Sequence, residues 1–293
     1  LIEEKLIMCG IAGFLCDENN LFKKNLINLS NIKNLLYHRG PDDHGVWHSN
    51  NEMVGFAHTR LSIQDLSSAG HQPMLSFSKR FMMIYNGEIY NHLNLKDKIK
   101  SIAPNITWKG KSDTETLLNS FDCLGIEETL NMCSGMFAMA VWDTHKKELI
   151  LARDRFGEKP LYFGIVENNF IFGSELKVFK KITKIDNKIS KESLNLFLRF
   201  AYVPGPRSIY NNIFKLPPGS LLKISKAELK VLIRTKNINF EKFKINYWWN
   251  AKEKFNFYSS SSGTFSEEEK ALEHTEKIIV ESIKSQLISD VPI

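Results

Sequence analysis

Short apolar runs separated by turn residues dominate the chain from residue 9 to about residue 249. Runs of this length that are rich in β-branched and aromatic residues predict β-strands. We expect strands at residues 11–15, 54–57, 81–85, 136–142, 148–152, 161–166 and 170–172. Polar segments at residues 143–147 and 167–169 join successive runs as hairpins, so the sheets should be antiparallel.

Helical periodicity fills the gaps between these strands. The apolar residues of the first such segment fall on one helical face, namely Leu26, Leu29, Ile32, Leu35 and Leu36. The sequence Ser-Asp-Thr-Glu at residues 112–115 fits a capping box and predicts a second helix, and residues 190–200 predict a third. Hairpin strands with helices between them indicate an α+β fold, with two sheets or one sheet covered by helices.

A different pattern begins near residue 250. Residues 250–265 are polar and include a run of four serines, which predicts a linker. A second capping box at residues 266–269 opens a long amphipathic helix, whose apolar face has no obvious partner in the residues that remain. We therefore expect residues 266–293 to begin a second domain that is cut short.

Composition narrows the function classes. The chain has 293 residues, of which 43% are hydrophobic and 11% aromatic, and this excludes intrinsic disorder. No run of about 18 apolar residues occurs, so we expect no membrane partner. The net charge of +6 comes from scattered lysines, which favours a solvated surface over a nucleic-acid site. Four cysteines without a CxxC pair exclude a disulfide scaffold and favour a reducing, cytoplasmic location.

The segment Met8-Cys9-Gly10 is the first candidate for chemistry. If Met8 were the translation start and were removed, Cys9 would carry a free α-amine beside its thiol. An α-amine titrates near about 7.7–8.0 and can accept the proton of the thiol, which turns the thiol into a nucleophile. By itself the segment is a weak signal, because a cysteine near a chain start is more often a small buried residue.

Four further segments are equally ambiguous when each is taken alone. Residues 38–42 fit a solvated loop, residues 58–63 a strand end, residues 85–90 a hairpin turn and residues 110–115 a helix cap. The eight histidines show neither HExxH nor HxxEH spacing, so no metal site is expected.

Taken together, the segments resemble one family. The matching stretches are MCGIAGF at 8–14, HRGPD at 38–42, RLSI at 60–63, NGEIYN at 86–91, SDTE at 112–115, SGMFA at 134–138, RDRFGEKPLY at 153–162 and SELK at 174–177. They follow the order found in the glutaminase half of glutamine-hydrolysing asparagine synthetases, and the resemblance covers residues 8–293.

The resemblance implies a fold and a division of the chain. The fold is the four-layer α/β/β/α sandwich of N-terminal-nucleophile hydrolases with antiparallel sheets, followed by the first helix of a truncated α/β ATP-pyrophosphatase domain. Residues 9–249 would form the class II glutaminase (glutamine amidotransferase) domain, residues 250–265 the linker and residues 266–293 the start of the synthetase domain. Residues 1–8 would be a leader absent from the mature protein.

The resemblance assigns three residues to catalysis. Cys9 would attack the side-chain amide of glutamine with its own α-amine as general base. The side-chain amide of Asn86 and the backbone N–H of Gly87 would stabilise the oxyanion that forms.

Five further residues would bind the substrate glutamine. Arg60 would pair with the α-carboxylate, and Asp113 with Glu88 would hold the α-ammonium. The backbone around Leu61 and Ile63 would line the rest of the pocket.

The resemblance also implies partners and cofactors. Glutamine would be hydrolysed with no cofactor in this chain, and in the full-length protein the ammonia would convert aspartate to asparagine with ATP and Mg²⁺. Members of the family often form homodimers. The family's ATP-binding Ser-Gly-Gly-x-Asp-Ser loop does not occur in these 293 residues. Two alternatives stay open: an amidotransferase that acts on a sugar or another carboxylate, and a non-catalytic fragment.

The leader has three interpretations. Translation could start at Met8, residues 1–8 could be a cleaved propeptide, or they could be retained and block the α-amine of Cys9. We favour a mis-assigned start.

Overall fold

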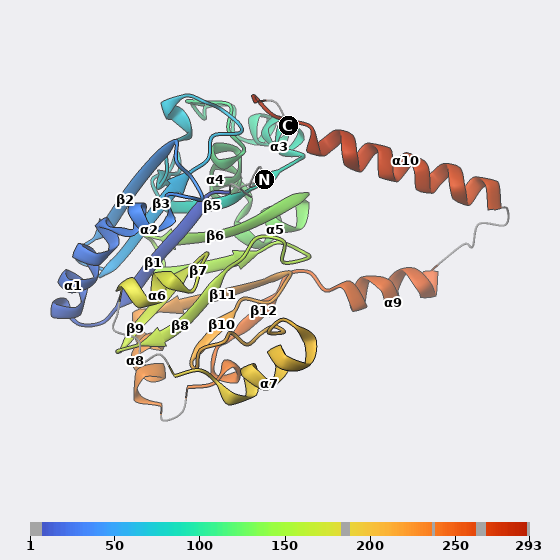
Figure 1. Cartoon of the computed structure of the whole chain (residues 1–293). Helices are drawn as coiled ribbons and strands as arrows, with labels where there is room; N and C mark the ends of the chain where they lie inside the picture. The colour runs from blue at the N-terminus through green and yellow to red at the C-terminus, as the bar shows by residue number, and fades with distance from the viewer. Residues whose placement is uncertain (1–7, 183–187, 236–237, 262–267, 292–293) are drawn as a thin grey trace, which may run out of the picture.

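Two antiparallel sheets lie face to face at the centre of the structure (Figure 1). The computed structural model describes residues 8–182, 188–235, 238–261 and 268–291. Strands of the first sheet follow the order β10 (Ile213–Lys215), β8 (Tyr162–Val166), β9 (Asn169–Gly173), β1 (Gly10–Cys16), β3 (Val54–Arg60) and β2 (Asp43–Ser49). Strands of the second sheet follow the order β12 (Ile245–Tyr247), β11 (Ser220–Ser225), β7 (Glu148–Arg153), β6 (Gly135–Asp143), β5 (Phe81–Ile89) and β4 (Met74–Leu75).

Side chains from both sheets form an apolar core between them. Successive residues of β1 point to opposite faces, so Ile11 and Leu15 enter this core while Phe14 faces the helices outside. The rings of Phe56 and Phe172 meet edge to face in the core, with centroids 5.8 Å apart. Because the central strands are buried on both faces, they are nearly continuous apolar runs, which is why the sequence pattern located them.

Helices cover the outer faces of both sheets. The first sheet is covered by α1 (Asn19–Ser30), α2 (Ile32–Leu36) and α6 (Lys177–Ile182), and the second by α3 (His92–Ile102), α4 (Asp113–Leu124) and α5 (Ile126–Met132). Further helices are α7 (Lys191–Phe200), α8 (Lys226–Arg234) and the 3₁₀ helices η1 (Ser68–Gly70) and η2 (Phe240–Lys242). The layers run helix, sheet, sheet, helix, so the predicted four-layer α/β/β/α architecture is confirmed.

The expected elements are present, with some differences of detail. All seven predicted strands form, as β1, β3 and β5 to β9. Ser112 caps α4, with its Oγ accepting the N–H of Glu115 at 3.2 Å. The carboxylate of Glu115 accepts the N–H groups of Lys109 and Gly110 instead of reaching back to the cap, so only half of the capping box forms.

The Asn86–Gly87 pair corrects one expectation. Taken alone, this dipeptide predicted a hairpin turn, but both residues lie inside β5, opposite Ala138 and Phe137 of β6. Strand pairing therefore overrides the local turn preference of the dipeptide. A Cβ atom on Gly87 would lie 2.3 Å from the carbonyl oxygen of Met136, so the close approach of β6 requires glycine here.

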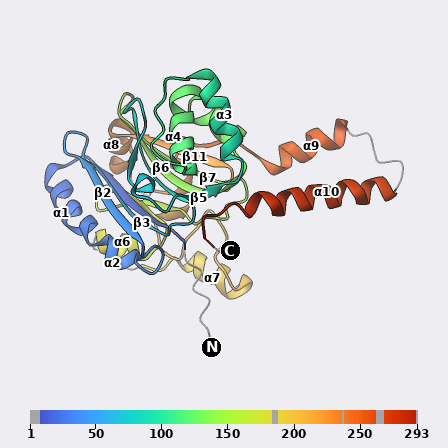
Figure 2. The same cartoon turned by 90° about the horizontal axis from the view of Figure 1, so that it is seen from above.

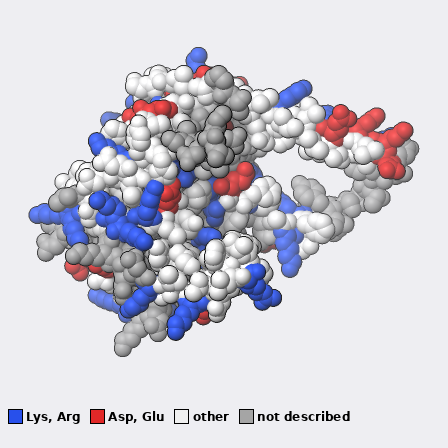
Figure 3. Space-filling model, viewed as in Figure 1, with Lys and Arg blue, Asp and Glu red and all other residues white. Residues whose placement is uncertain are grey.

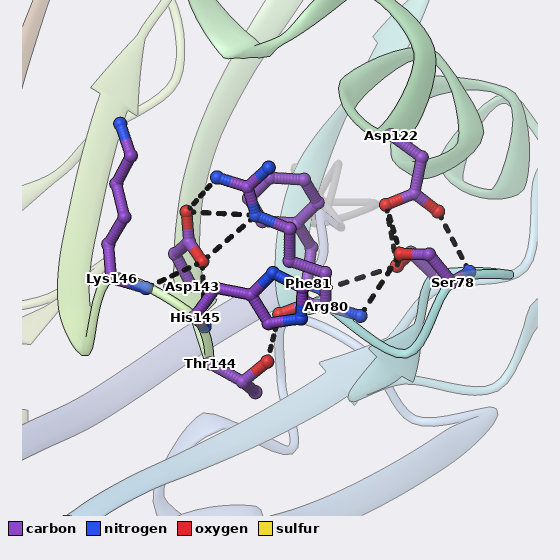
Figure 4. A network of polar contacts seen from close by, with 9 residues as sticks. Ser78, Arg80, Phe81, Asp122, Asp143, Thr144, His145 and Lys146 are labelled. Atoms are coloured by element: carbon purple, nitrogen blue, oxygen red, sulfur yellow. Dashed lines mark hydrogen bonds and ion pairs between the residues drawn. The ribbon is translucent and has the colours of Figure 1, made fainter.

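A polar network closes the β6–β7 hairpin (Figure 4). The Asp143 carboxylate accepts the N–H groups of His145 and Lys146 and pairs with Arg80 at 2.7 Å. Burial by itself would raise the pKa of Asp143, but these hydrogen bonds and the Arg80 charge hold it below its usual range. The predicted hairpin at residues 143–147 thus has a side-chain anchor in the strand beside it.

The C-terminal arm, residues 251–291, differs from the sandwich. Helix α9 (Ala251–Ser261) leads away from the sandwich and α10 (Glu268–Gln286) returns toward it (Figures 1 and 2). Glu268 and Glu269 lie in the first turn of α10, where acidic side chains gather at the outer end of the arm (Figure 3). None of the described residues of α10 is buried.

The predicted linker and the predicted start of the second domain lie on this arm. The expected linker at residues 250–265 contains α9, so its first part is helical, which its polar composition did not predict. The predicted helix after residue 266 is present as α10. Residues 1–7 of the expected leader lie outside the described residues. No helix in the described part of the chain is long and apolar enough to cross a membrane.

Candidate active site

All eight residues singled out in the sequence surround one cavity of about 230 Å³. The first sheet supplies Cys9, which directly precedes β1, and Arg60 at the end of β3. The second sheet supplies Asn86, Gly87 and Glu88 from β5. The set is completed by Leu61 and Ile63 in the loop after β3 and by Asp113, the first residue of α4. The cavity therefore lies where the two sheets and α4 meet.

The Cys9 sulfur sits against the backbone of the loop after β3. Leu61 donates its N–H to Cys9 Sγ at 3.3 Å. The Cys9 thiol in turn donates to the carbonyl oxygen of Leu61, which lies 3.6 Å from Sγ. Burial raises the pKa of the Cys9 thiol to about 11, although the Leu61 N–H and the Arg60 charge act to lower it. A thiol with this pKa is protonated at neutral pH, so it needs a neighbouring base to become a nucleophile.

The HRGPD segment holds the backbone of Cys9 in place. Arg39 donates from Nε to the carbonyl oxygen of Cys9 at 3.0 Å. Its guanidinium is in turn fixed by Glu175, whose carboxylate lies 3.2 Å from Arg39 and 2.8 Å from His38. A motif that could have been a solvated loop therefore orients the candidate nucleophile.

Two hydrogen-bond donors on β5 are directed at the cavity, the side-chain amide of Asn86 and the backbone N–H of Gly87. Asn86 is 2% exposed, and its Nδ2 has no hydrogen-bond partner among the described residues. Alternate N–H groups of a strand point the same way, and those of Tyr85 and Ile89 donate to Gln72 and Asp113, which line the cavity. The N–H of Gly87 lies between them on the same edge, so it too is directed at the cavity.

Acidic groups gather at the other side of the cavity. Asp113 Oδ2 accepts the hydroxyl of Tyr85 and the N–H of Ile89, both at 2.9 Å. Burial raises the pKa of Asp113, against the lowering effect of these hydrogen bonds. Burial also raises the pKa of Glu88, and the neighbouring Asp113 charge adds to the rise. Two desolvated carboxyls that repel each other form an environment that favours a bound cation.

Arg60 contributes a positive charge to the cavity and is held rigidly. Its guanidinium donates to the carbonyl oxygens of Ser67 at 3.0 Å, Gln64 at 3.3 Å and Asp65. A Cβ atom on Gly70 would overlap this guanidinium, so the loop wraps closely around it. A fixed guanidinium beside two acidic groups matches the charges of a free amino acid, which carries one carboxylate and one ammonium.

Lys159 is a cavity residue that the sequence reasoning did not single out. It is 8% exposed, and its Nζ lies 3.2 Å from the Met8 sulfur. Burial lowers the pKa of Lys159, while Glu88 acts to raise it. Asp154 positions it by accepting the Lys159 N–H at 3.1 Å. The RDRFGEKPLY stretch that contains both residues was part of the resemblance, but nothing in its spacing indicated that it reaches the cavity.

His58 connects the two sheets beside the cavity. Its Nε2 lies 3.0 Å from the carbonyl oxygen of Tyr85, which fits a neutral ring that donates from Nε2. Burial lowers the pKa of His58 to about 3, so the ring stays neutral at ordinary pH. Within the described residues, no group of three or more His, Cys, Asp or Glu side chains could hold a metal ion.

Comparisons with known proteins identify the family. A glutamine amidotransferase domain family matches residues 8–235. The putative asparagine synthetase [glutamine-hydrolyzing] 2 of Methanocaldococcus jannaschii is 31% identical over 98% of this chain and 53% of its own length. The asparagine synthetase [glutamine-hydrolyzing] 1 of Bacillus subtilis is 31% identical over 98% of this chain and 41% of its own. The chain thus spans about half the length of these relatives.

A solved structure shares the fold. The glutamine phosphoribosylpyrophosphate amidotransferase from B. subtilis superposes with a TM-score of 0.54 at 19% identity, over 82% of this chain and 49% of that one. The expected N-terminal-nucleophile hydrolase fold is therefore confirmed. The resemblance to glutamine-hydrolysing asparagine synthetases is also confirmed, and the chain belongs to the glutamine amidotransferase domain family.

Proposed function

We propose that this domain hydrolyses glutamine to glutamate and ammonia with Cys9 as the nucleophile. The observation that carries the proposal is the cavity itself, in which a thiol, a fixed guanidinium and two acids meet a buried amide donor that has no partner among the described residues. The α-carboxylate of glutamine would pair with Arg60, and its α-ammonium with Asp113 and Glu88. This placement directs the side-chain amide toward Cys9 and Asn86.

The first chemical step would form a thioester. The Cys9 α-amine takes the thiol proton, and the sulfur bonds to the side-chain carbonyl carbon of glutamine. The carbonyl oxygen becomes an oxyanion, which Asn86 Nδ2 and the Gly87 N–H stabilise. The C–N bond then breaks, and the proton on the amine passes to the leaving nitrogen, which departs as ammonia.

The second step would release glutamate. Water attacks the thioester carbon while the α-amine accepts a proton from the water. The same two donors hold the second oxyanion. The C–S bond breaks, the thiol regains its proton, and glutamate leaves. The reaction needs a free thiol, which a reducing cytoplasm preserves.

This mechanism requires that the active form begin at Cys9. In the chain as given, the Cys9 nitrogen is part of the peptide bond to Met8 and cannot act as a base. Met8 also lines the cavity, with its sulfur 3.2 Å from Lys159 Nζ. Removal of residues 1–8 would therefore supply the base and open space beside the sulfur.

The direct test is glutamate release from glutamine by protein that starts at Cys9. We expect hydrolysis by this form, and a loss of at least about 1,000-fold in kcat for Cys9→Ala. Cys123→Ser is the matched control, because Cys123 lies on α4 away from the cavity and should leave the rate unchanged. Hydrolysis that survives Cys9→Ala would refute the proposed nucleophile. Equal activity of the chain with residues 1–8 attached would refute the α-amine as base.

For the whole protein, we infer that the ammonia serves the ATP-dependent conversion of aspartate to asparagine. Two relatives that match 98% of this chain are named glutamine-hydrolysing asparagine synthetases. ATP and Mg²⁺ would be bound by residues that follow Ile293. The alternative is a different acceptor, since the amidotransferase that shares the fold is named for phosphoribosylpyrophosphate.

The coding sequence after Ile293 and an acceptor assay distinguish these possibilities. We expect a Ser-Gly-Gly-x-Asp-Ser loop to follow and the longer protein to form asparagine from aspartate, ATP, Mg²⁺ and glutamine. Amidation of a sugar phosphate with no asparagine formed would reject aspartate as the acceptor.

A further inference from the structure

The end of the C-terminal arm rests on the loop that forms one wall of the cavity. Asp290 donates its N–H to the carbonyl oxygen of Ile63 at 2.9 Å. Its carboxylate Oδ2 accepts the N–H of Asp65 at 2.7 Å, and the Gln64 side chain reaches the carbonyl oxygen of Ile288 at 3.5 Å. Residues 288–290 therefore bind the backbone on either side of residue 64, at Ile63 and Asp65, where the loop turns.

The loop adopts a conformation that needs support. Asp65 has φ of +57°, the left-handed region that residues with a side chain avoid unless the surroundings hold them there. Its own carboxylate accepts the N–H and hydroxyl of Ser67, and its backbone N–H goes to Asp290. One of the bonds that fix this residue thus comes from the arm, 225 residues along the chain.

The same loop orients the guanidinium of Arg60. The Arg60 guanidinium is held by the carbonyl oxygens of Gln64, Asp65 and Ser67, and all three acceptors belong to the loop that turns at Asp65. Asp65 also reaches the opposite wall, because its Oδ2 accepts the N–H of Lys111, two residues before Asp113. The Asp65 side chain is thus fixed by Lys111, while its backbone connects the Asp290 contact to the Arg60 end of the proposed glutamine site.

We propose that Asp290 is a positioning residue for Arg60, so that docking of the arm tunes the affinity for glutamine. The inference rests on the proposed function. Asp290 touches neither substrate nor reacting atoms, and it acts through the Asp65 turn. Because Arg60 would bind the α-carboxylate, losing the contact weakens glutamine binding and leaves the chemical step at Cys9 largely unchanged. A change in the docking of the arm would in this way change the affinity of the cavity for glutamine.

The kinetic test compares variants of the protein that starts at Cys9. We expect Asp290→Ala to raise KM for glutamine about threefold to tenfold, the range for loss of one hydrogen bond, with kcat changed less than about twofold. Asp290→Asn keeps an acceptor oxygen and should restore most of the affinity. Asp97→Ala, which removes an exposed carboxylate on α3, is the control for loss of a surface charge and should leave KM unchanged.

A substrate without the α-carboxylate separates positioning from general damage. With 4-aminobutanamide, which lacks the group that Arg60 would bind, Asp290→Ala and the parent protein should give equal kcat/KM. An unchanged KM for glutamine in Asp290→Ala would overturn the inference. So would an equal loss of kcat/KM with both substrates.

Amide hydrogen exchange tests the contact without relying on any activity. We expect the N–H of Asp65 to exchange faster in Asp290→Ala than in the parent chain, while amides of β9 stay unchanged. If Asp290→Ala exchanges faster at Asp65 but the parent protein fails to hydrolyse glutamine, the proposed function is refuted and the docking contact is preserved. Unchanged exchange at Asp65 would refute the docking contact whatever the activity.

Discussion

Large apolar side chains are buried between the sheets of the sandwich but exposed on the C-terminal arm. Between the sheets, Phe56 and Phe172 are fully buried and pack edge to face. On α10, Ile279 and Ile283 are 53% and 54% exposed although they lie on one helical face. The sandwich has completed its core within the described residues, whereas the arm presents an apolar face to solvent.

Polar groups also distinguish the sandwich from the arm, by where they lie and what they bind. The sandwich buries Arg60 and Asp113 and binds each of them with several hydrogen bonds, yet leaves Asn86 Nδ2 without a partner in the described structure. The arm contributes polar contacts at its end, where Asp290 meets the loop after β3. Stability and chemistry should therefore depend on the sandwich, while the arm should affect the affinity of the cavity.

The largest expected effect is on the stability of the sandwich. Phe172→Ala removes a fully buried ring from the core between the sheets and should lower the free energy of unfolding by about 3–5 kcal/mol. Urea unfolding followed by tryptophan fluorescence measures this loss. A change below about 1 kcal/mol would mean that the two sheets are not held together by this core.

A nearly equal effect is expected on catalysis at Asn86. Removing an oxyanion donor typically costs about 2.7–4 kcal/mol, so Asn86→Ala should lower kcat about 100-fold to 1,000-fold. Stability should not fall, because the variant also removes a buried donor that no described residue satisfies. Asn119→Ala is the matched control, since Asn119 is a buried asparagine on α4 whose Nδ2 likewise lacks a described partner. A similar loss of activity in both variants would argue against an oxyanion role.

A smaller effect is expected on the pH dependence at Lys159. The positive charge of Lys159 lowers the pKa of the Cys9 thiol, so Lys159→Met should raise that pKa. The same positive charge disfavours protonation of the Cys9 α-amine, so its loss should also raise the pKa of that base and move the acidic limb of kcat/KM for glutamine to higher pH, by up to about one unit. Lys100→Met, which removes an exposed charge on α3, serves as the control and should leave the profile in place. A shift to lower pH in Lys159→Met would contradict the electrostatic role.

The smallest effect is expected on the arm. Ile279→Gln replaces an exposed residue of α10 and should change the free energy of unfolding by less than about 0.5 kcal/mol. Thermal unfolding of the two proteins side by side measures the difference. A loss above about 1 kcal/mol would show that this face is covered in solution and would remove the contrast with Phe172→Ala.

Most of the strands that the sequence missed share a physical cause. Four of the five are the sheet edges β2, β4, β10 and β12, and the fifth is β11. Edge strands are short or alternate with polar residues because solvent reaches one side of them, so they lack the continuous apolar run of the central strands. Asp43–Ser49 illustrates this, since only Gly45 within it is buried.

The candidate site could be assembled from motifs because each motif ends at the same place in the fold. Cys9, Arg60, Asn86 and Asp113 come from four segments, and the structure brings them around one cavity. Lys159 could not be found in this way, because its place depends on how Asp154 folds the loop after β7. The contact of Asp290 was equally hidden, since it joins residues 225 positions apart.

Covalent labelling tests the central claim, that Cys9 is the nucleophile of a glutamine site, most directly. Protein that starts at Cys9 is treated with a diazoketone analogue of glutamine and mapped by peptide mass analysis. We expect one adduct, on Cys9, whose formation is slowed by glutamine, while Cys16, Cys123 and Cys133 remain unmodified. Labelling of another cysteine in place of Cys9, or labelling of Cys9 that glutamine does not slow, would contradict the account.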